Sequence, residues 1–580
     1  MPPSSTSATW TGHPRIRGAS EPLQLFLLTA SLIGLQFCWG TEMTYCTPFL
    51  LSLGLSKSSL SLVWVAGPLS GLIMQPVIGM ISDRWTGRWG RRRPFMVGGT
   101  VGVVVLLGVL GWCEGLVGAF GGGRGATIVV AVVDIFVLDF VINIVQSTCR
   151  SLIVDTLPVE KQQLGSAWGM YISLPDGRGA HEAVVDGWLT GLGHLMVYAV
   201  GSLDLVAILG PTFLGDTQFK KVCAIAALAI AVAQGVTCWA VSERVLVSSG
   251  TEKDGSSKSA TTIVKDLYKT TMNLPPPIQS ICWVQFWSWI GWFPFLFYSS
   301  TWVGEIYMRY DAPEADSPVS SSDALSDVGR VGSRALIVFA FVSFAFSILL
   351  PYIARSSDDG PPYTPRPPQS LEPILKGVRL PSSWKPTLPA AWMMANVLFA
   401  ITMIFAPIVH SVHFATILVA ICGLPWSIGG WASFALMGTE INRLSTSLPQ
   451  SQSNTNSSYR QLSTTDEMEM TSDPSPPRIL HLRHDSEADA DVHTSTGELA
   501  GVYLGILNLY TTLPQFVGTG ISTIVFSILE PGKSPELAQH APPEEHHSAE
   551  GVSGIGVCLF IGAVCAMWAA WKCRKLGGTW

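Results

Sequence analysis

The chain has 580 residues and a formal net charge of -6, and 48% of its residues are hydrophobic while only 13% are charged. Soluble proteins carry about 25% charged residues, so this composition excludes an ordinary soluble protein and predicts an integral membrane protein. The small net charge comes mainly from loops, and we expect no nucleic-acid partner.

Apolar segments recur along the whole chain. A spanning helix needs about 20 apolar residues, and twelve segments meet that length. They centre on residues 24–45, 60–82, 94–113, 127–149, 186–207, 219–241, 277–300, 335–354, 388–409, 411–438, 498–528 and 551–571. Six segments, a polar linker and six more predict an all-α integral membrane protein with twelve transmembrane helices in two six-helix bundles.

Polar stretches mark the predicted domain boundaries. We expect an N-terminal tail at 1–20, a first bundle at 21–242, a linker at 243–272 and a second bundle at 273–575. A Ser/Thr-rich stretch at 443–497 interrupts the second bundle and cannot build a core. We expect a disordered loop there, and we prefer a solvated connection to a phosphorylated regulatory segment.

Basic residues gather in alternate loops. Arg15 and Arg17 precede the first segment, and residues 84–93 contain five arginines after the second. Lys and Arg are retained on the cytoplasmic side during insertion. We therefore predict a multi-pass protein with both termini in the cytoplasm, and we prefer the plasma membrane to the vacuolar membrane.

The sequence GPLSGLIMQPVIGMISDRWTGRWGRRRPF occupies residues 67–95 and joins an apolar helix to a basic turn. It resembles the loop between helices two and three of major facilitator transporters. The fuller string resembles the sucrose and glucoside/proton symporters of the glycoside–pentoside–hexuronide family, which implies the major facilitator fold. The implied cytoplasmic gate motif consists of Gly79, Asp83, Arg84, Arg91, Arg92 and Arg93.

Residues 168–190 interrupt the predicted fifth helix. Asp176, Arg178 and Glu182 lie there, and each charge at mid-membrane costs about 3 kcal/mol. Related fungal transporters pass almost directly from a segment like GSAW to one like GHL-GYAVGS. We therefore expect an insertion near 170–186, either genuine or a retained intron in the gene sequence.

The fourth helix, LDFVINIVQSTCRSLIVD, carries the richest set of charges. Asp139 and Arg150 are three helical turns apart and share a face. The spacing of Asp139, Arg150 and Asp155 resembles the segment LDLANNTVQGPARALLAD of plant sucrose symporters. That resemblance implies that Arg150 and Asp139 bind the sugar and couple it to the proton. Asp155 is a further proton-coupling candidate; the alternative is a structural pair of Arg150 and Asp155.

Two glutamates lie in other apolar helices. Glu42 in the first is costly unless it carries a proton or has a partner, and a buried hydrogen bond is the alternative. Glu305 ends a segment that resembles WFPFLLFDTDWMGREVY of the plant proteins, whose aspartates align with Ser299 and Thr301. Glu305 is a proton-coupling candidate, although its position differs by one residue from that of the glutamate in the plant segment. Lys57 aligns with an extracellular histidine of the plant proteins, so sugar selectivity cannot be copied from them.

Aromatic and amide side chains complete the candidate sugar site. Trp39 and Trp292 are expected to stack on sugar rings, whereas Trp64 and Trp302 fit the interfacial belt of membrane proteins. Asn508 and Gln515 are seven residues apart and share a helix face. They are expected to line the cavity, with helix-packing hydrogen bonds as the alternative.

These features together predict a secondary transporter that imports a glucoside such as sucrose or maltose with a proton. The alternatives are a transporter of another sugar and a non-transporting sugar sensor on the same fold. The chain has no GxxxxGK[ST] phosphate loop and no catalytic constellation, so we expect neither an ATP-driven pump nor an enzyme. We expect no cofactor and no metal, and the sequence leaves the oligomeric state open.

Overall fold

The computed structural model describes residues 9–83, 85–156, 192–248, 271–312, 321–353, 385–447, 487–538, 540–546 and 551–577. Arg84 and the predicted insertion near 170–186 lie outside these ranges. Most of the two predicted polar segments, 243–272 and 443–497, lies outside as well. At the described edges of these segments, a strand reaches Ser248, one helix ends at Ser447 and another begins at Glu487.

The described elements are almost all helical. The first half contains β1 (Thr9–Thr11), β2 (Arg15–Ile16), α1 (Glu21–Thr41), η1 (Glu42–Cys46), α2 (Thr47–Ser52), α3 (Lys57–Val63), α4 (Ala66–Asp83), α5 (Arg93–Ala119), α6 (Arg124–Thr156), α9 (Leu205–Leu209), α10 (Gln218–Ala240), β3 (Val241–Ser242) and β4 (Val245–Ser248). The second half contains α12 (Pro276–Ile306), η2 (Tyr307–Asp311), α13 (Ser321–Ile353), α15 (Leu388–Met403), η4 (Ala406–Ile408), α16 (Val412–Ile421), α17 (Gly423–Ser447), α18 (Glu487–Leu529), η5 (Pro543–Glu545) and α19 (Gly554–Gly577).

Within the described ranges, 10 helices are long and apolar enough to cross a membrane. The 31-residue helix α12 and the shorter apolar helix Leu192–Ser202 occupy the positions of the predicted seventh and fifth spans. The prediction of an all-α membrane protein is therefore confirmed, and the structure is consistent with twelve spans.

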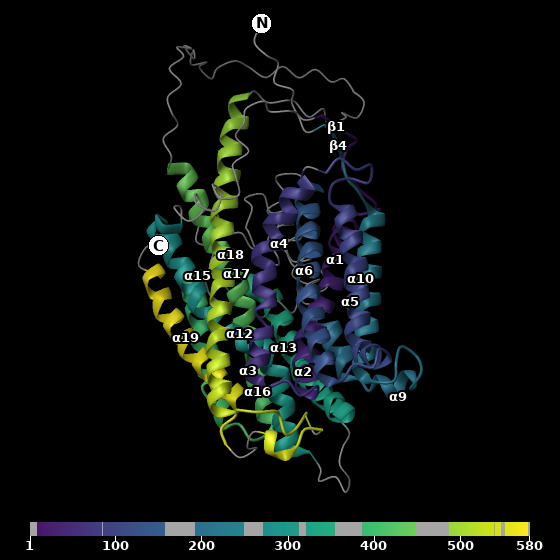
Figure 1. Cartoon of the computed structure of the whole chain (residues 1–580). Helices are drawn as coiled ribbons and strands as arrows, with labels where there is room; N and C mark the ends of the chain where they lie inside the picture. Colours follow the sequence, from purple (N-terminus) through teal and green to yellow (C-terminus); the bar gives the residue numbers. More distant parts are fainter. Residues whose placement is uncertain are drawn as a thin grey trace, which may run out of the picture.

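The helices form two packed groups that stand side by side (Figure 1). The first bundle contains α1, α4, α5, α6 and α10, and the second contains α12, α13, α15, α17, α18 and α19. Small residues allow close crossings. In the second bundle, for example, a Cβ added to Gly291 would lie 2.7 Å from the Gly562 carbonyl oxygen.

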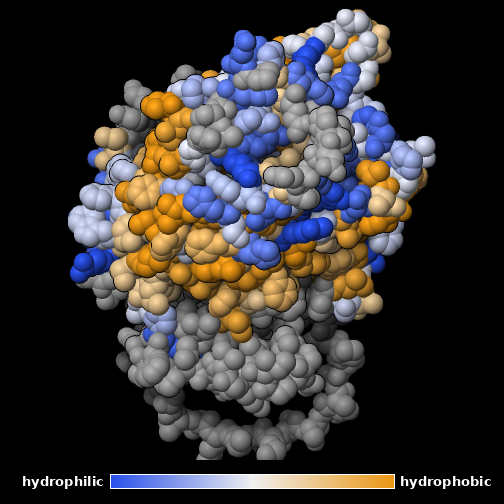
Figure 2. Space-filling model, turned by 90° about the horizontal axis from the view of Figure 1, so that it is seen from below, coloured by the Kyte–Doolittle hydropathy of each residue, from blue (hydrophilic) through white to orange (hydrophobic). Residues whose placement is uncertain are grey.

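The two ends of the molecule differ. At the β end, β1 pairs with β4 and β2 pairs with β3, both antiparallel, so the N-terminal segment is joined to the chain that follows α10. At the opposite, loop end lie residues 530–546 after α18 (Figure 1). Figure 2 shows this end, with hydrophilic residues over the middle of the face and hydrophobic residues around its sides. The apolar sides are those expected to face lipid.

Two tryptophans lie elsewhere than predicted. Trp64 is 0% exposed and Trp302 is 1% exposed, so neither belongs to an interfacial belt. Trp64 packs on Phe297 with ring centroids 4.6 Å apart, and these residues come from different bundles. The prediction was wrong because position near a helix end does not reveal that another bundle covers the ring.

Candidate functional site

Two buried carboxyl groups face each other in the first bundle, and we call Glu42 and Asp139 the carboxyl pair. Glu42 is 2% exposed and Asp139 is 0% exposed. Their side chains lie within hydrogen-bonding reach of each other. None of their four oxygens has another donor among the residues that the structure describes. Two carboxylates this close cannot both stay ionised away from water, so the pair is built to hold at least one proton.

A local change of helix geometry places Glu42. The first span continues from α1 through the π-helical turn η1 into α2, and Glu42 is the first residue of that turn. Such turns are rare and often mark functional sites. The carbonyl oxygens of Met43 and Thr44 in this turn accept hydrogen bonds from Ser300 Oγ of the second bundle, at 3.2 and 3.3 Å. The turn thus connects the carboxyl pair to the boundary between the bundles.

A polar bond fixes α6 against α4 beside the carboxyl pair. Asn143 Nδ2 donates to Ser70 Oγ and to the Asp139 carbonyl oxygen, both at 2.9 Å. Arg150 lies further along α6, and eleven residues of helix correspond to a rise of about 16 Å. Asp139 and Arg150 therefore lie at different depths in the bundle, and their shared role stays a prediction.

Charged residues at the β end form a cluster within the first bundle, and we call Asp83, Arg91, Arg92, Asp155 and Glu243 the β-end cluster. Arg91 Nε and Arg92 Nε donate to Asp155 Oδ2 at 3.0 and 2.8 Å. Arg92 also binds Asp83. The side chain of Asp155 is therefore held by two arginines from the turn before α5, which fits a structural role; its proton-coupling role stays a prediction.

Glu243 holds the same turn from the other side. Its carboxylate accepts the backbone N–H groups of Arg91, Arg92 and Arg93 at 2.9, 2.9 and 2.8 Å. These N–H groups lie at the N-terminus of α5, where a negative charge is favourable. A Cβ added to Gly79 of the predicted gate motif would meet nothing within 4 Å among the described atoms. The two bundles instead meet nearer the loop end.

A second charged cluster connects the two bundles at the loop end, and we call Lys57, Glu305, Arg309, Glu530 and Glu536 the loop-end cluster. Lys57 Nζ lies 2.7 Å from Glu305 Oε1 and 2.9 Å from Glu530 Oε2. Arg309 lies 2.5 Å from Glu536 and 3.6 Å from Glu530. The five side chains are only 1–9% exposed. Lys57 comes from α3, whereas the other four residues belong to the second half of the chain.

Most of this cluster could not be recognised in the sequence. Glu305 was a candidate and Lys57 was noticed only as a departure from the plant proteins. Glu530 and Glu536 follow the eleventh predicted span in the segment LEPGKSPELAQ. Two acidic residues so close to the end of an apolar helix were the available signal, but a pattern cannot show that a lysine distant in sequence neutralises them.

Comparisons with known proteins identify the fold. A family model described as MFS/sugar transport protein matches residues 29–154. The general alpha-glucoside permease of Schizosaccharomyces pombe is 28% identical, with 96% of this chain and 93% of that protein covered. The structure of a bacterial homolog of the human lysosomal transporter Spinster, inward-facing and unoccupied, matches 97% of this chain and 98% of its own at 13% identity and a TM-score of 0.53.

The chain is similar to transporters of the major facilitator superfamily. Sucrose transport protein SUC4 of Arabidopsis thaliana is also similar, at 30% identity over 53% of this chain and 59% of the plant protein. These relatives are named as a permease and a transport protein.

The remaining predicted sugar-site residues are dispersed. Trp39 is half-buried against the core of the first bundle. Trp292 is 5% exposed and packs against Phe399 and Trp426 in the second bundle, with ring centroids 4.4 and 5.0 Å apart. This packing favours a core role for Trp292.

The two amide candidates lie on α18. Asn508 is exposed, and Gln515 is half-buried with its Nε2 donating to the Thr511 carbonyl oxygen at 3.1 Å. The hydrogen bond of Gln515 stays within one helix and holds the amide in place without using all its hydrogen-bonding capacity. A role of either residue in sugar binding remains a prediction.

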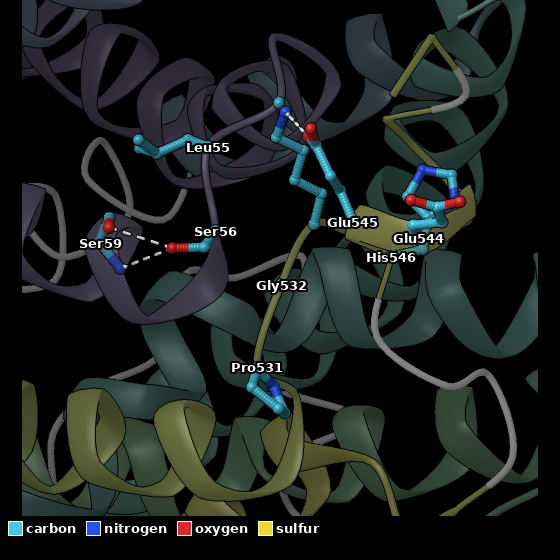
Figure 3. A pocket seen from close by; sticks show the side chains of 10 residues that line it. Leu55, Ser56, Ser59, Pro531, Gly532, Glu544, Glu545 and His546 are labelled. Atoms are coloured by element: carbon cyan, nitrogen blue, oxygen red, sulfur yellow. Dashed lines mark hydrogen bonds and ion pairs between the residues drawn. The ribbon is translucent and has the colours of Figure 1, made fainter. Parts of the chain in front are cut away.

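A depression of about 560 Å³ opens on the loop end between the two halves (Figure 3). Leu55, Ser56 and Ser59 form one wall, and Pro531, Gly532 and the residues around Glu545 form the other. An ion pair between Lys533 and Glu545, 2.5 Å long, ties the second wall together. The depression therefore lies over the junction that the loop-end cluster holds from within.

Proposed function

We propose that the protein is a symporter that imports a glucoside, such as sucrose or maltose, together with a proton. The carboxyl pair of Glu42 and Asp139 carries this proposal, because a buried pair without another donor among the described residues needs a proton. Similarity to an alpha-glucoside permease over 96% of the chain supports the substrate class. Arg150 is the proposed sugar ligand, since its guanidinium offers a fixed fork of donors for hydroxyl groups.

The proposed orientation places the β end in the cytoplasm and the loop end outside. Five arginines between residues 84 and 93 support it, because basic loops are retained on the cytoplasmic side. The plasma membrane is the proposed location. In this orientation the loop-end cluster closes the protein to the outside, as an inward-facing form requires.

The proposed cycle uses movement of residues 21–242 against 273–575 around the carboxyl pair. With the site open to the outside, Glu42 or Asp139 takes up a proton and the sugar binds. Ser300 transmits rearrangement of the π-helical turn to the second bundle through its bonds to Met43 and Thr44. The site then opens inward, and each proton contributes about 2.3 kcal/mol per 100 mV of membrane potential.

Uptake of radiolabelled sucrose and maltose by a transport-deficient yeast tests the proposal. We would compare acidic with neutral medium, with and without an uncoupler, and would express both the full chain and a form lacking residues 170–186. Acid-stimulated, uncoupler-sensitive uptake is expected in at least one form. Surface delivery of both without any flux would instead support a sugar sensor.

Glu42→Gln separates coupling from binding. The amide cannot release a proton, so we expect loss of uphill accumulation while exchange of internal for external sugar persists. Glu114→Gln is the matched control, because Glu114 is an exposed acid of the same bundle. If cells expressing Glu42→Gln still accumulate sugar normally, the carboxyl pair does not couple the proton to the sugar.

A further inference from the structure

The loop-end cluster contains more negative than positive groups. Two cations, Lys57 and Arg309, face three carboxylates, Glu305, Glu530 and Glu536. All five side chains are at least nine-tenths buried. Buried charges are tolerated only when they are well paired, so the cluster depends on every cation that it has.

Opening of the loop end would remove one of those cations. Lys57 is the member that moves with the first bundle, whereas Arg309 would stay with the three glutamates. Among the described residues of the cluster, one arginine would then face three carboxylates. Carboxylates crowded in this way bind protons more readily because each disfavours the ionised form of the others.

The surroundings indicate which carboxylates would take the proton. Burial opposes ionisation of Glu536, but Lys57 and Arg309 outweigh it and keep the pKa of Glu536 below its ordinary value. Ser534 Oγ also donates to Glu536 at 2.8 Å. Arg309 and Ser534 belong to the second half of the chain and stay beside Glu536 when Lys57 leaves, so Glu536 keeps two groups that favour its ionised form. The two glutamates that face Lys57, Glu305 and Glu530, are therefore the candidates.

Other titratable groups stand near the cluster and need controls. The ring of His410 lies 5.0 Å from that of Tyr310, and Asp311 accepts the N–H of Val412. The other described groups are His540, His546, the ion pair of Lys533 and Glu545, and Glu544. A small hollow lined by Glu305, Arg309 and His410 adjoins the cluster. It borders Glu305, one of the two candidate glutamates.

We propose that the loop-end cluster is a second proton-binding site, distinct from the carboxyl pair, that acts as the outer gate. Separation of Lys57 from Glu305 and Glu530 opens the gate and is accompanied by proton uptake on one of these two glutamates. External acid therefore favours the outward-open form directly. The proposal rests on the proposed orientation, but it does not require that the sugar be a glucoside.

Cysteine labelling in intact cells tests this gate without sugar flux. Ser61 lies one helical turn from Lys57 on α3 and is 0% exposed, whereas Ser59 on the same helix is exposed. Cells expressing Ser61→Cys would be treated with a membrane-impermeant maleimide at about pH 5 and about pH 7.5. Dividing each rate by that of Ser59→Cys corrects for the lower thiolate concentration in acid.

We expect the corrected labelling rate of Ser61→Cys to rise on acidification, by at most about tenfold per pH unit for one linked proton. Adding Glu305→Gln or Glu530→Gln mimics the protonated acid, so labelling should be high and independent of pH. Glu545→Gln and His410→Gln should leave the acid response intact. The unsubstituted chain measures background from the native cysteines, which are buried or half-buried throughout the described ranges.

Three results would overturn the gate. These are equal corrected rates at both pH values, loss of the response in His410→Gln, or an unchanged response in both glutamine variants at normal surface level. Absence of Ser59→Cys labelling would place the loop end inside and overturn both the orientation and the gate. An acid response without sugar uptake would contradict the proposed symport alone.

Discussion

The two charged clusters of this transporter differ in which bundles their residues come from. The β-end cluster lies wholly in the first bundle, and Asp83 in it is 51% exposed. The loop-end cluster is almost fully buried and joins Lys57 of one bundle to acids of the other. Charges within a bundle hold that bundle together, whereas charges between bundles hold the two bundles to each other.

The largest expected effect comes from Lys57→Met. Removing one partner of a buried ion pair costs about 3–5 kcal/mol, and here the cost falls on the form closed at the loop end. Sugar uptake should fall by more than about tenfold at equal surface level. Uptake by a transport-deficient yeast measures this loss.

A charge exchange provides the control for Lys57. Lys57→Glu combined with Glu305→Lys keeps both charges at the junction and should recover part of the uptake that either single change removes. If the double variant is no better than the single ones, the ion pair is not what closes the loop end.

An intermediate effect is expected from Arg92→Ala at the β end. Arg92 is buried between Asp83 and Asp155, but Arg91 continues to bind Asp155. Loss of one such partner should destabilise the purified protein by about 1–3 kcal/mol and lower its melting temperature. Uptake per surface molecule should change little, because the bonds lie within one bundle.

Arg124→Ala is the matched control for Arg92, since Arg124 is an exposed arginine at the start of α6 in the same bundle. It should leave the melting temperature unchanged. The β-end cluster is expected to affect stability and the loop-end cluster to affect transport. If Arg92→Ala has a normal melting temperature but a reversed pH response or an altered direction of transport, this distinction between the clusters is wrong.

The smallest effect is expected from Asp204→Asn. Asp204 binds Arg330 across the bundles at 2.5 Å, but the side chains are 46% and 24% exposed, and an exposed pair contributes only about 0–1 kcal/mol. The backbone N–H of Ala207, and then Arg330, keep the pKa of Asp204 below its ordinary value. Its contribution is therefore present above about pH 4, the ordinary value for an aspartate, and disappears as the pH falls through the lowered value.

Uptake measured from neutral medium down to strongly acidic medium checks Asp204. Asparagine still caps α9, so the variant removes the charge and not the helix start. Near neutral pH we expect less than about a twofold change. A loss as large as that of Lys57→Met would show that burial does not distinguish the two junctions.

Much of the fold could be predicted because hydrophobic length is a local property. Spans, basic loops and the gate motif each depend on neighbouring residues. Glu42 and Asp139 were also recognised separately, since a carboxyl group in an apolar helix is unusual wherever it lies. Their contact could not be predicted, because it depends on how the first span packs against the fourth.

Other misses have the same cause. The burial of Lys57 could not be predicted because the sequence does not reveal that α18 packs on α3. Trp64 was assigned to the membrane interface for the same reason. Trp292 packs against Phe399 and Trp426, and its role in sugar binding stays a prediction.

The strand pairs at the β end offer a way to observe the transporter at work. Because β1 and β2 are bonded to β4 and β3, and Arg17 N–H donates to the Ala240 carbonyl oxygen at 2.9 Å, the start of the chain is anchored to the first bundle. The end of α19 belongs to the second bundle. Fluorescent donor and acceptor proteins fused to the two chain termini would therefore be attached to opposite bundles. The efficiency of energy transfer between them in living cells would then change when the two bundles move relative to each other.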